Sequence, residues 1–314
     1  MKADQRSRCS PVLLIALAVM LSLPACAQDP DGPGHRLQTL REMRANKREN
    51  DALKVSEEAL GAHSQNVVQD RFNGRDLILY VPSRLPPAGQ RGMVVALHGG
   101  GGNAQYIQDH LKMDGVAERN EFIVAYLNGS DASLRLPSKM KAWNAGNGCC
   151  GEPYKNKVDD IGYITGAVQY LVHKYAVNPK RVYGIGHSNG AMMTQTLMCE
   201  TNVYSKAISL AGSLMADVVM CPNARGKILL AIHGADDRNV PPSGGRGSKG
   251  VTNIEYKSEA SSRAMFESSG GKYSIQWLPG TDHSLEHIGA TIQEREGISL
   301  AEKAARFFGL AQSK

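Results

Sequence analysis

Short runs of consecutive apolar residues recur along the chain, each bounded by glycine, proline or polar residues. Runs of this length that lack polar alternation are typical of strands buried on both faces of a parallel sheet. They predict strands at 93–98, 122–126, 206–212 and 227–234, and further strands are expected at 181–186 and 273–280. Because both faces of such a sheet are apolar, helices are expected to cover both of them.

Between these runs, apolar residues recur at the spacing of one helix face. In 159–175, Ile161, Ile164 and Val168 share such a face, and Asp159 or Asp160 is suited to cap its start. Helices are expected at 104–119, 159–175, 189–199, 258–270 and 299–310. The alternation of strands and helices predicts one α/β domain with a mostly parallel, doubly wound sheet.

An N-terminal β-hairpin is expected before the first buried strand. The segments 66–72 and 75–81 are separated by Asn-Gly, which is the strongest short-range hairpin signal. Residues 127–157 are rich in Gly, Asn, Ser and Lys and are expected to form a long surface loop. The Gly/Ser-rich stretch 241–250 is too short for a domain linker, so a single domain is expected over 63–314.

The first 27 residues have the pattern of an export signal. Basic residues precede the apolar run "PVLLIALAVMLSLP", and "ACAQD" then offers a cleavage site after Ala27. The alternative is a lipoprotein signal in which Cys26 is acylated, but Pro24 fits that signal badly. Residues 1–27 are therefore expected to be a signal peptide, and the protein is expected to be secreted or periplasmic.

Composition and charge argue against nucleic-acid binding and against a transmembrane anchor. The chain has 314 residues, 42% of them hydrophobic and 21% charged, and a formal net charge of +6, which is too mild to indicate nucleic-acid binding. No apolar run in the body of the chain is long enough for a transmembrane anchor. The locally basic segment 28–62 is expected to be a polar arm, helical or disordered.

Four cysteines follow the leader, and an exported protein can oxidise them. Four cysteines allow three connectivities, and spacing alone does not choose among them. A bridge between Cys199 and Cys221 is favoured, because it would join the end of one helix to a later loop. The adjacent residues Cys149 and Cys150 are expected either to form a vicinal bridge or to remain thiols. No cysteine or histidine spacing indicates a metal site.

The strongest candidate for chemistry is Ser188 in "GIGHSNGAMM". Gly-x-Ser-x-Gly alone is a weak signal, but here it lies between a predicted strand and a predicted helix. That context is the one a nucleophile elbow requires, with the serine held out on a sharp turn. Gly186 and Gly190 leave room where side chains would collide with backbone, and the helix N-terminus places free N–H groups beside the serine oxygen.

The glycine-rich stretch "LHGGGGN" follows the strand 93–98. Backbone N–H groups there can bind a developing oxyanion, which makes Gly99 and Gly100 candidate donors together with the N–H of Asn189. The stretch matches neither a dinucleotide-binding nor a P-loop pattern, so no nucleotide cofactor is expected. His98 precedes the serine in sequence and is expected to be a structural hydrogen-bonder beneath the loop.

A serine nucleophile of this kind is followed in the chain by an acid and then by a histidine base. Asp236 and Asp237 follow the strand 227–234, and both qualify as the acid. His283 and His287 follow the last strand. His283 lies directly in the loop after the strand and is favoured over His287.

These motifs carry a resemblance to a known family. "HGGGGNA", "CCG", "VDDIGY", "NPKRVYGIGHSNGAMM", "HGADDRNVP" and the late "DHS" are similar to the α/β-hydrolase family of secreted esterases that includes polyhydroxybutyrate depolymerases, feruloyl esterases and acetylxylan esterases. The resemblance spans about residues 66–310. It implies a single α/β-hydrolase domain in which the acid is Asp237, and it suggests Trp143 as an aromatic substrate contact.

The expected function is that of a serine carboxylic-ester hydrolase, acting through an acyl-enzyme with Ser188, Asp237 and His283 and without a metal or cofactor. The expected substrate is a small or oligomeric ester of the polyhydroxybutyrate depolymerase type. Feruloyl or acetylxylan ester hydrolysis is the alternative. A serine peptidase on the same scaffold, or a non-catalytic binding protein that retains the fold, are the rival classes.

Overall fold

The computed structural model describes residues 66–132, 139–249 and 253–311. The chain divides into two units, Met1–Glu58 and Ala59–Lys314, and all described residues belong to the second. The expected signal peptide (1–27) and polar arm (28–62) lie outside the described residues and remain expectations. None of the helices within the described ranges is long and apolar enough to cross a membrane.

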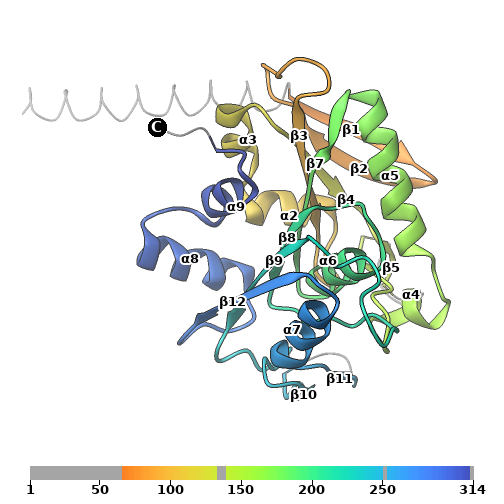
Figure 1. Cartoon of the computed structure of the whole chain (residues 1–314), viewed down its shortest axis with the longest axis vertical. Helices are drawn as coiled ribbons and strands as arrows, with labels where there is room; N and C mark the ends of the chain where they lie inside the picture. The colour runs from red at the N-terminus through yellow and green to blue at the C-terminus, as the bar shows by residue number, and fades with distance from the viewer. Residues whose placement is uncertain (1–65, 133–138, 250–252, 312–314) are drawn as a thin grey trace, which may run out of the picture. The chain divides into compact units, whose positions relative to one another are not determined.

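Eight strands form the main sheet of the described residues, in the order β1-β2-β4-β3-β7-β8-β9-β12 (Figure 1). The strands β1 and β2 form an antiparallel hairpin, β2 runs antiparallel to β4, and all other neighbours are parallel. Their bounds are Val67–Phe72 (β1), Arg75–Tyr80 (β2), Arg91–Leu97 (β3), Ile123–Leu127 (β4), Val177–His187 (β7), Lys206–Leu210 (β8), Ile228–Gly234 (β9) and Lys272–Leu278 (β12). The expected mostly parallel sheet with an N-terminal hairpin is confirmed.

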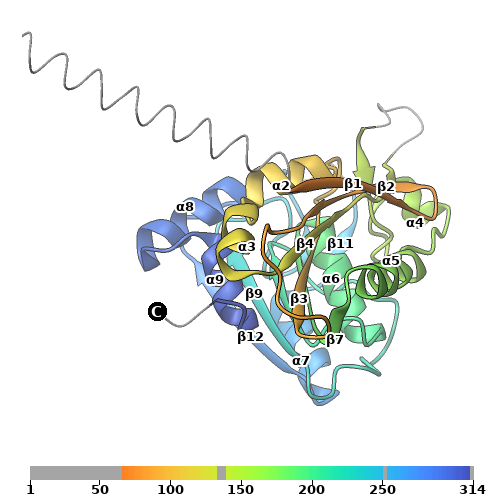
Figure 2. The same ribbon diagram turned by 90° about the horizontal axis from the view of Figure 1, so that it is seen from above.

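Helices cover both faces of this sheet, which Figure 2 shows along its edge. One face carries α5 (Asp160–Lys174), α6 (Asn189–Glu200) and α7 (Glu259–Ser268), and the other carries α2 (Ala104–Leu111), α3 (Asp114–Asn120), α8 (Leu285–Glu296) and α9 (Leu300–Phe308). Successive residues of β3 enter opposite layers, so Met93 and Val95 join one core and Val94 and Ala96 the other. This two-sided burial explains the continuous apolar runs in the sequence.

Three local predictions were wrong. The helix expected over 104–119 is two helices, because Lys112 adopts a left-handed conformation (φ 52°) and ends the first of them. The expected surface loop 127–157 contains a small two-stranded sheet, β5 (Ser130–Asp131) with β6 (Lys141–Ala142), and the helix α4 (Gly151–Lys155). The helix α8 was not expected. A second two-stranded sheet pairs β10 (Gly245–Arg246) with β11 (Glu255–Tyr256).

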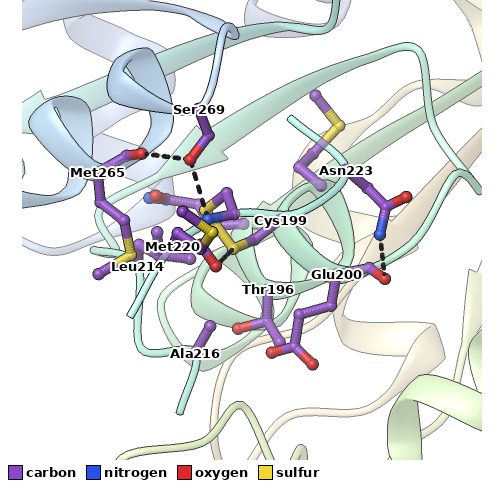
Figure 3. The surroundings of a disulfide bond; sticks show 12 residues. Thr196, Cys199, Glu200, Leu214, Ala216, Met220, Asn223, Met265 and Ser269 are labelled. Carbon is purple, nitrogen blue, oxygen red and sulfur yellow. Dashed lines mark hydrogen bonds between the residues drawn. A yellow bond between two sulfur atoms is a disulfide. The ribbon is translucent and has the colours of Figure 1, made fainter. Parts of the chain in front are cut away.

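Two disulfides join the four cysteines of the described residues, one between Cys199 and Cys221 and one between the neighbours Cys149 and Cys150. The first fastens the C-terminal end of α6 to the loop after β8 (Figure 3). Hydrogen bonds hold the same loop, because the N–H of Cys221 donates to Ser269 Oγ (3.0 Å) and Asn223 Nδ2 donates to the carbonyl of Glu200 (2.7 Å). The bridge therefore closes a short loop that is already ordered by its neighbours.

Replacing this bridge by the double substitution C199S/C221S should lower the free energy of unfolding by about 3 kcal/mol, because the unfolded chain gains the freedom of an opened loop. Urea unfolding of the oxidised native chain and the double variant would measure the difference. An unchanged unfolding midpoint would show that the hydrogen bonds around the loop suffice without the bridge.

Candidate active site

Ser188 lies at the sharp turn between β7 and α6, where the sequence motif placed it. Its backbone has φ 55° and ψ −120°, a conformation that costs a non-glycine residue on the order of 1–3 kcal/mol. The turn is crowded, since a Cβ on Gly186 would meet the carbonyl of Gly190, and a Cβ on Gly190 would meet the carbonyls of Leu97 and His98. Only glycine at these two positions lets α6 begin against the end of β3.

His283 reaches this serine from the loop after β12. Its Nε2 lies 2.8 Å from Ser188 Oγ, and its Nδ1 lies 2.7 Å from Asp237 Oδ2. Asp237 follows β9 and is buried, so the three side chains form a continuous chain of hydrogen bonds at the carboxyl ends of three parallel strands. This is the edge at which open α/β sheets bind their ligands.

The Asp237 carboxylate accepts four hydrogen bonds. Oδ1 accepts from the N–H groups of Asn239 (2.8 Å) and Val240 (2.9 Å), while Oδ2 faces both His283 and His233 Nε2 (3.1 Å). Burial opposes ionisation of Asp237, but the hydrogen bonds from His233 and His283 outweigh it and hold the pKa of the carboxyl well below its usual range. Asp237 therefore stays negatively charged over the whole ordinary pH range.

The rival acid and base lie outside this arrangement. Asp236 is exposed, and its neighbour Asp237 is the one that meets a histidine. His287 lies in the first turn of α8, where its Nδ1 faces Asp282 Oδ1 (2.8 Å) and its side chain is 65% exposed. The structure thus brings Asp237 and His283 together with Ser188, and it leaves Asp236 and His287 apart from the serine.

The glycine-rich loop lies against the serine. A Cβ on Gly99 would fall 3.3 Å from Ser188 Cβ, and one on Gly100 would fall 3.6 Å from Asn189 Cβ. Within the described residues, the N–H groups of Gly99, Gly100 and Asn189 donate to no protein acceptor. Gly99 and Gly100 belong to the loop after β3 and Asn189 is the first residue of α6, so the three candidate donors come from two neighbouring segments beside Ser188.

Trp143 does not line the cavity, so its expected role as a substrate contact is corrected. Its side chain is fully buried, and its Nε1 donates to the carbonyl of His98 (2.9 Å). Its backbone is paired with the Asn189 side chain, since the N–H donates to Asn189 Oδ1 (2.7 Å) and the carbonyl accepts from Asn189 Nδ2 (3.0 Å). Trp143 and Asn189 together brace the glycine-rich loop against the first turn of α6.

His98 is buried beneath the glycine-rich loop, as expected for a structural residue. Its Nδ1 donates to the carbonyl of Gly99 (2.8 Å), and its Nε2 accepts from the N–H of Gly129 (3.0 Å). Burial lowers the pKa of His98 to about 4. The ring is therefore neutral at ordinary pH and holds one fixed tautomer, which ties the loop to the end of β4.

A cavity of about 550 Å³ opens over Ser188 and His283. In the part of its wall that the structure describes, no lysine, arginine, aspartate or glutamate side chain contributes. Apolar and aromatic side chains form much of that wall, among them Tyr106, Met140, Ala142, Met192, Val240 and Tyr256. Cys150 of the vicinal bridge also lines it. The site can thus hold an uncharged, mainly apolar group next to the serine.

Residues 86–276, more than half of the chain, match the model of the phospholipase/carboxylesterase family. The chain belongs to this family. A feruloyl esterase B of Piromyces equi is 29% identical over 127 residues, which cover 39% of this chain and 22% of that protein. A probable feruloyl esterase C of Aspergillus clavatus is 28% identical over 181 residues, covering 56% of this chain and 59% of that protein. The chain therefore spans less than two thirds of these relatives.

Solved structures of esterases share the fold of this chain. An acetyl xylan esterase from Aspergillus awamori aligns with a TM-score of 0.53 at 14% identity and covers 78% of this chain and 99% of its own. An esterase from Thermogutta terrifontis aligns with a TM-score of 0.55 at 13% identity, covering 79% and 95%. At these identities the likeness establishes the α/β-hydrolase fold.

Two further histidines of the site, His187 and His233, lie within the quoted motifs, but sequence reasoning assigned neither of them a role. His187 Nε2 donates to the backbone carbonyl of His283 (2.9 Å), and burial lowers the pKa of His187 to about 4, so this ring is neutral. His233 lies behind Asp237 and faces Glu259 on its other side. The sequence contained one signal for each, because His187 directly precedes the serine and His233 stands four residues before Asp237.

Substituting Asn189 by alanine should keep its backbone N–H but leave the N–H of Trp143 buried without its acceptor. The expected loss in the free energy of unfolding is about 2 to 3 kcal/mol, since both hydrogen bonds to the Trp143 backbone and the one to Cys149 Sγ disappear and one buried donor stays unpaired. Urea unfolding of N189A measures it, with the exposed Asn202→Ala as the matched control. Equal midpoints for the two variants would contradict the bracing role of Asn189.

Proposed function

We propose that the chain is a serine carboxylic-ester hydrolase in which Ser188 is the nucleophile, His283 the general base and Asp237 the acid. The observation that carries the proposal is the uninterrupted chain of hydrogen bonds from Ser188 Oγ through His283 to the Asp237 carboxylate. Membership of the phospholipase/carboxylesterase family supports it. Serine, base and acid in this geometry are the machinery of acyl transfer.

The reaction follows from the positions of these groups. His283 Nε2 takes the proton of Ser188 as Oγ attacks the ester carbonyl carbon, and the N–H groups of Gly99, Gly100 and Asn189 receive the oxyanion. The imidazolium then gives its proton to the departing alcohol, which leaves an acyl-enzyme. Water then attacks the acyl-enzyme ester with His283 again as the base. The carboxylic acid product leaves, and Ser188 is free for another turnover. Side chains and backbone N–H groups supply every step.

The proposed substrate is a neutral ester with an apolar or aromatic acyl group. The support is the uncharged described wall of the cavity, in which Tyr106 and Tyr256 offer rings and Met140 and Met192 offer flexible apolar surface. Relatives named feruloyl esterase and acetylxylan esterase point in the same direction. We therefore place feruloyl or acetyl esters of polysaccharides ahead of the hydroxybutyrate oligomers expected from sequence.

Export of the protein also belongs to this proposal. Its supports are the leader pattern of 1–27 and the two disulfides, because paired cysteines persist in oxidising compartments outside the cytoplasm. We propose a secreted or periplasmic location with cleavage after Ala27.

Ser188→Ala should abolish hydrolysis of a short p-nitrophenyl ester, with a loss in kcat of ~10⁴-fold or more, because no other group can form the acyl-enzyme. Asp237→Asn and His283→Ala should also lose most activity. The matched controls Asp236→Asn and His287→Ala should keep it, since neither side chain meets the serine or its base. Turnover by folded S188A would contradict the proposal, and so would equal effects of the two aspartate substitutions.

A substrate panel would test the proposed specificity. Feruloyl esters and acetylated xylan should be hydrolysed with higher kcat/KM than hydroxybutyrate oligomers, and a peptide of matched size should not be hydrolysed. Fastest turnover of the hydroxybutyrate oligomers would restore the depolymerase-type substrate, and peptide cleavage would favour the peptidase class. Failure of a fluorophosphonate to label Ser188 would favour a non-catalytic binding protein.

A further inference from the structure

A second, fully buried histidine stands behind the proposed acid. His233 is the penultimate residue of β9, and its Nε2 lies 3.1 Å from Asp237 Oδ2 and 3.0 Å from the carbonyl oxygen of Val240. On the opposite side of the ring, Nδ1 lies 2.7 Å from Glu259 Oε1. Glu259 is itself buried at the start of α7, where its Oε2 accepts from the Tyr273 hydroxyl (2.5 Å).

Both ring nitrogens of His233 thus face acceptors. A neutral imidazole carries one N–H and one lone pair, so it would point that lone pair at a carboxylate oxygen or at a carboxylate and a carbonyl together. Such a contact is repulsive and cannot be relieved by water at a site that is 0% exposed. With both carboxyl groups ionised, only the doubly protonated ring satisfies all three acceptors.

The same geometry completes the shell of Asp237. A carboxylate offers about four lone-pair sites, and here two backbone N–H groups, His283 and His233 occupy them. The carboxylate therefore cannot rotate without breaking a bond, and its Oδ2 stays aimed at His283 Nδ1. The buried charges also alternate in sign along the row Asp237, His233, Glu259, so the cation lies between the two carboxylates.

We propose that His233 is a positioning residue, an imidazolium at neutral pH held by Glu259, which keeps Asp237 ionised and oriented toward His283. This inference rests on the proposed function, because Asp237 matters to catalysis only if His283 is the base. Neither His233 nor Glu259 lines the cavity, so both act through Asp237. The groups that face His233 are Asp237 after β9, Glu259 on α7 and the Trp277 ring on β12. The Tyr273 hydroxyl of β12 contacts Glu259 on its other oxygen.

The pKa of His233 agrees with this geometry. Burial by itself lowers it, but the hydrogen bonds to Asp237 and Glu259 outweigh burial and raise the pKa of His233 to about 9. The folded chain thus holds this proton more tightly than the unfolded chain. Its stabilising contribution is fully present below the ordinary histidine pKa of about 6.5 and is lost as the pH rises through about 9.

The direction in which the acid limb of the pH–activity profile shifts in one double variant tests the proposal. The double variant His233→Gln/Glu259→Gln replaces a buried ion pair by an amide pair of similar size, which preserves hydrogen bonds and favours folding. Of the two charges removed, the cation is the closer to His283, because both histidines contact the same Asp237 oxygen. The acid limb of kcat/KM for a p-nitrophenyl ester should therefore move to higher pH by roughly half to one unit.

If His233 is neutral, the acid limb of the kcat/KM profile should shift in the opposite direction. The double variant would then remove only the negative charge of Glu259, and the acid limb would move to lower pH. A shift to lower pH, or an unmoved limb, overturns the proposal. The matched control is Arg263→Gln/Glu267→Gln, which removes an exposed ion pair (3.0 Å) from the same helix α7 and should leave the profile in place.

A measurement without substrate separates this inference from the proposed function. In the chain labelled with ¹⁵N-histidine, the imidazole spectrum at pH 8 should show one ring protonated on both nitrogens, and the double variant should lack it. Absence of such a ring in the native spectrum overturns the inference even if S188A abolishes hydrolysis. Its presence together with full activity of S188A would instead overturn the proposed function and leave the protonation of His233 established.

Discussion

The close approach of α6 to the end of β3 is the constraint on which the rest of the site depends. The first turn of α6 presses on the carbonyls of Leu97 and His98, which leaves no room for a side chain at Gly190 or Gly186. Ser188 absorbs the sharp reversal with a positive φ (55°) and is thereby held out toward the cavity. The same approach brings the glycine-rich loop after β3 beside the serine, so the proposed nucleophile and the proposed oxyanion donors are positioned by one packing contact.

The braces around this contact come from a segment that has little regular structure. Asn189 uses both ends of its amide on the backbone of Trp143, and the Trp143 indole in turn holds the carbonyl of His98. Each of these groups is buried, so each hydrogen bond must be made or its partner is left unpaired. An aromatic residue that looked like a substrate contact is therefore part of the support of the site.

Behind His283, the proposed base, the buried groups are charged or polar rather than apolar. Two carboxylates, Asp237 and Glu259, are buried with His233 between them. In the proposed imidazolium state, His233 separates the two carboxyl groups and offsets the repulsion that two buried carboxylates would otherwise have in a medium of low dielectric. The net single negative charge of the row faces His283, where it favours the positive charge that the base acquires when it takes a proton.

The sequence by itself determined the layered architecture, because periodicity and turn residues are local properties and the buried strands carry them without interruption. It also marked Ser188, since the strand, the glycines and the helix of the elbow are contiguous in the chain. It could not place the break at Lys112, the helix α8 or the burial of Trp143, which depend on packing against distant elements. Spacing alone left Asp236 and Asp237 equally placed; the family resemblance implied Asp237, and the position directly after the last strand favoured His283 over His287. The tertiary structure shows that Asp237 and His283 meet Ser188, because their contact joins loops that are distant in the chain. The row from Asp237 to Glu259 joins β9 to α7, and no local pattern records a contact between residues that the fold alone brings together.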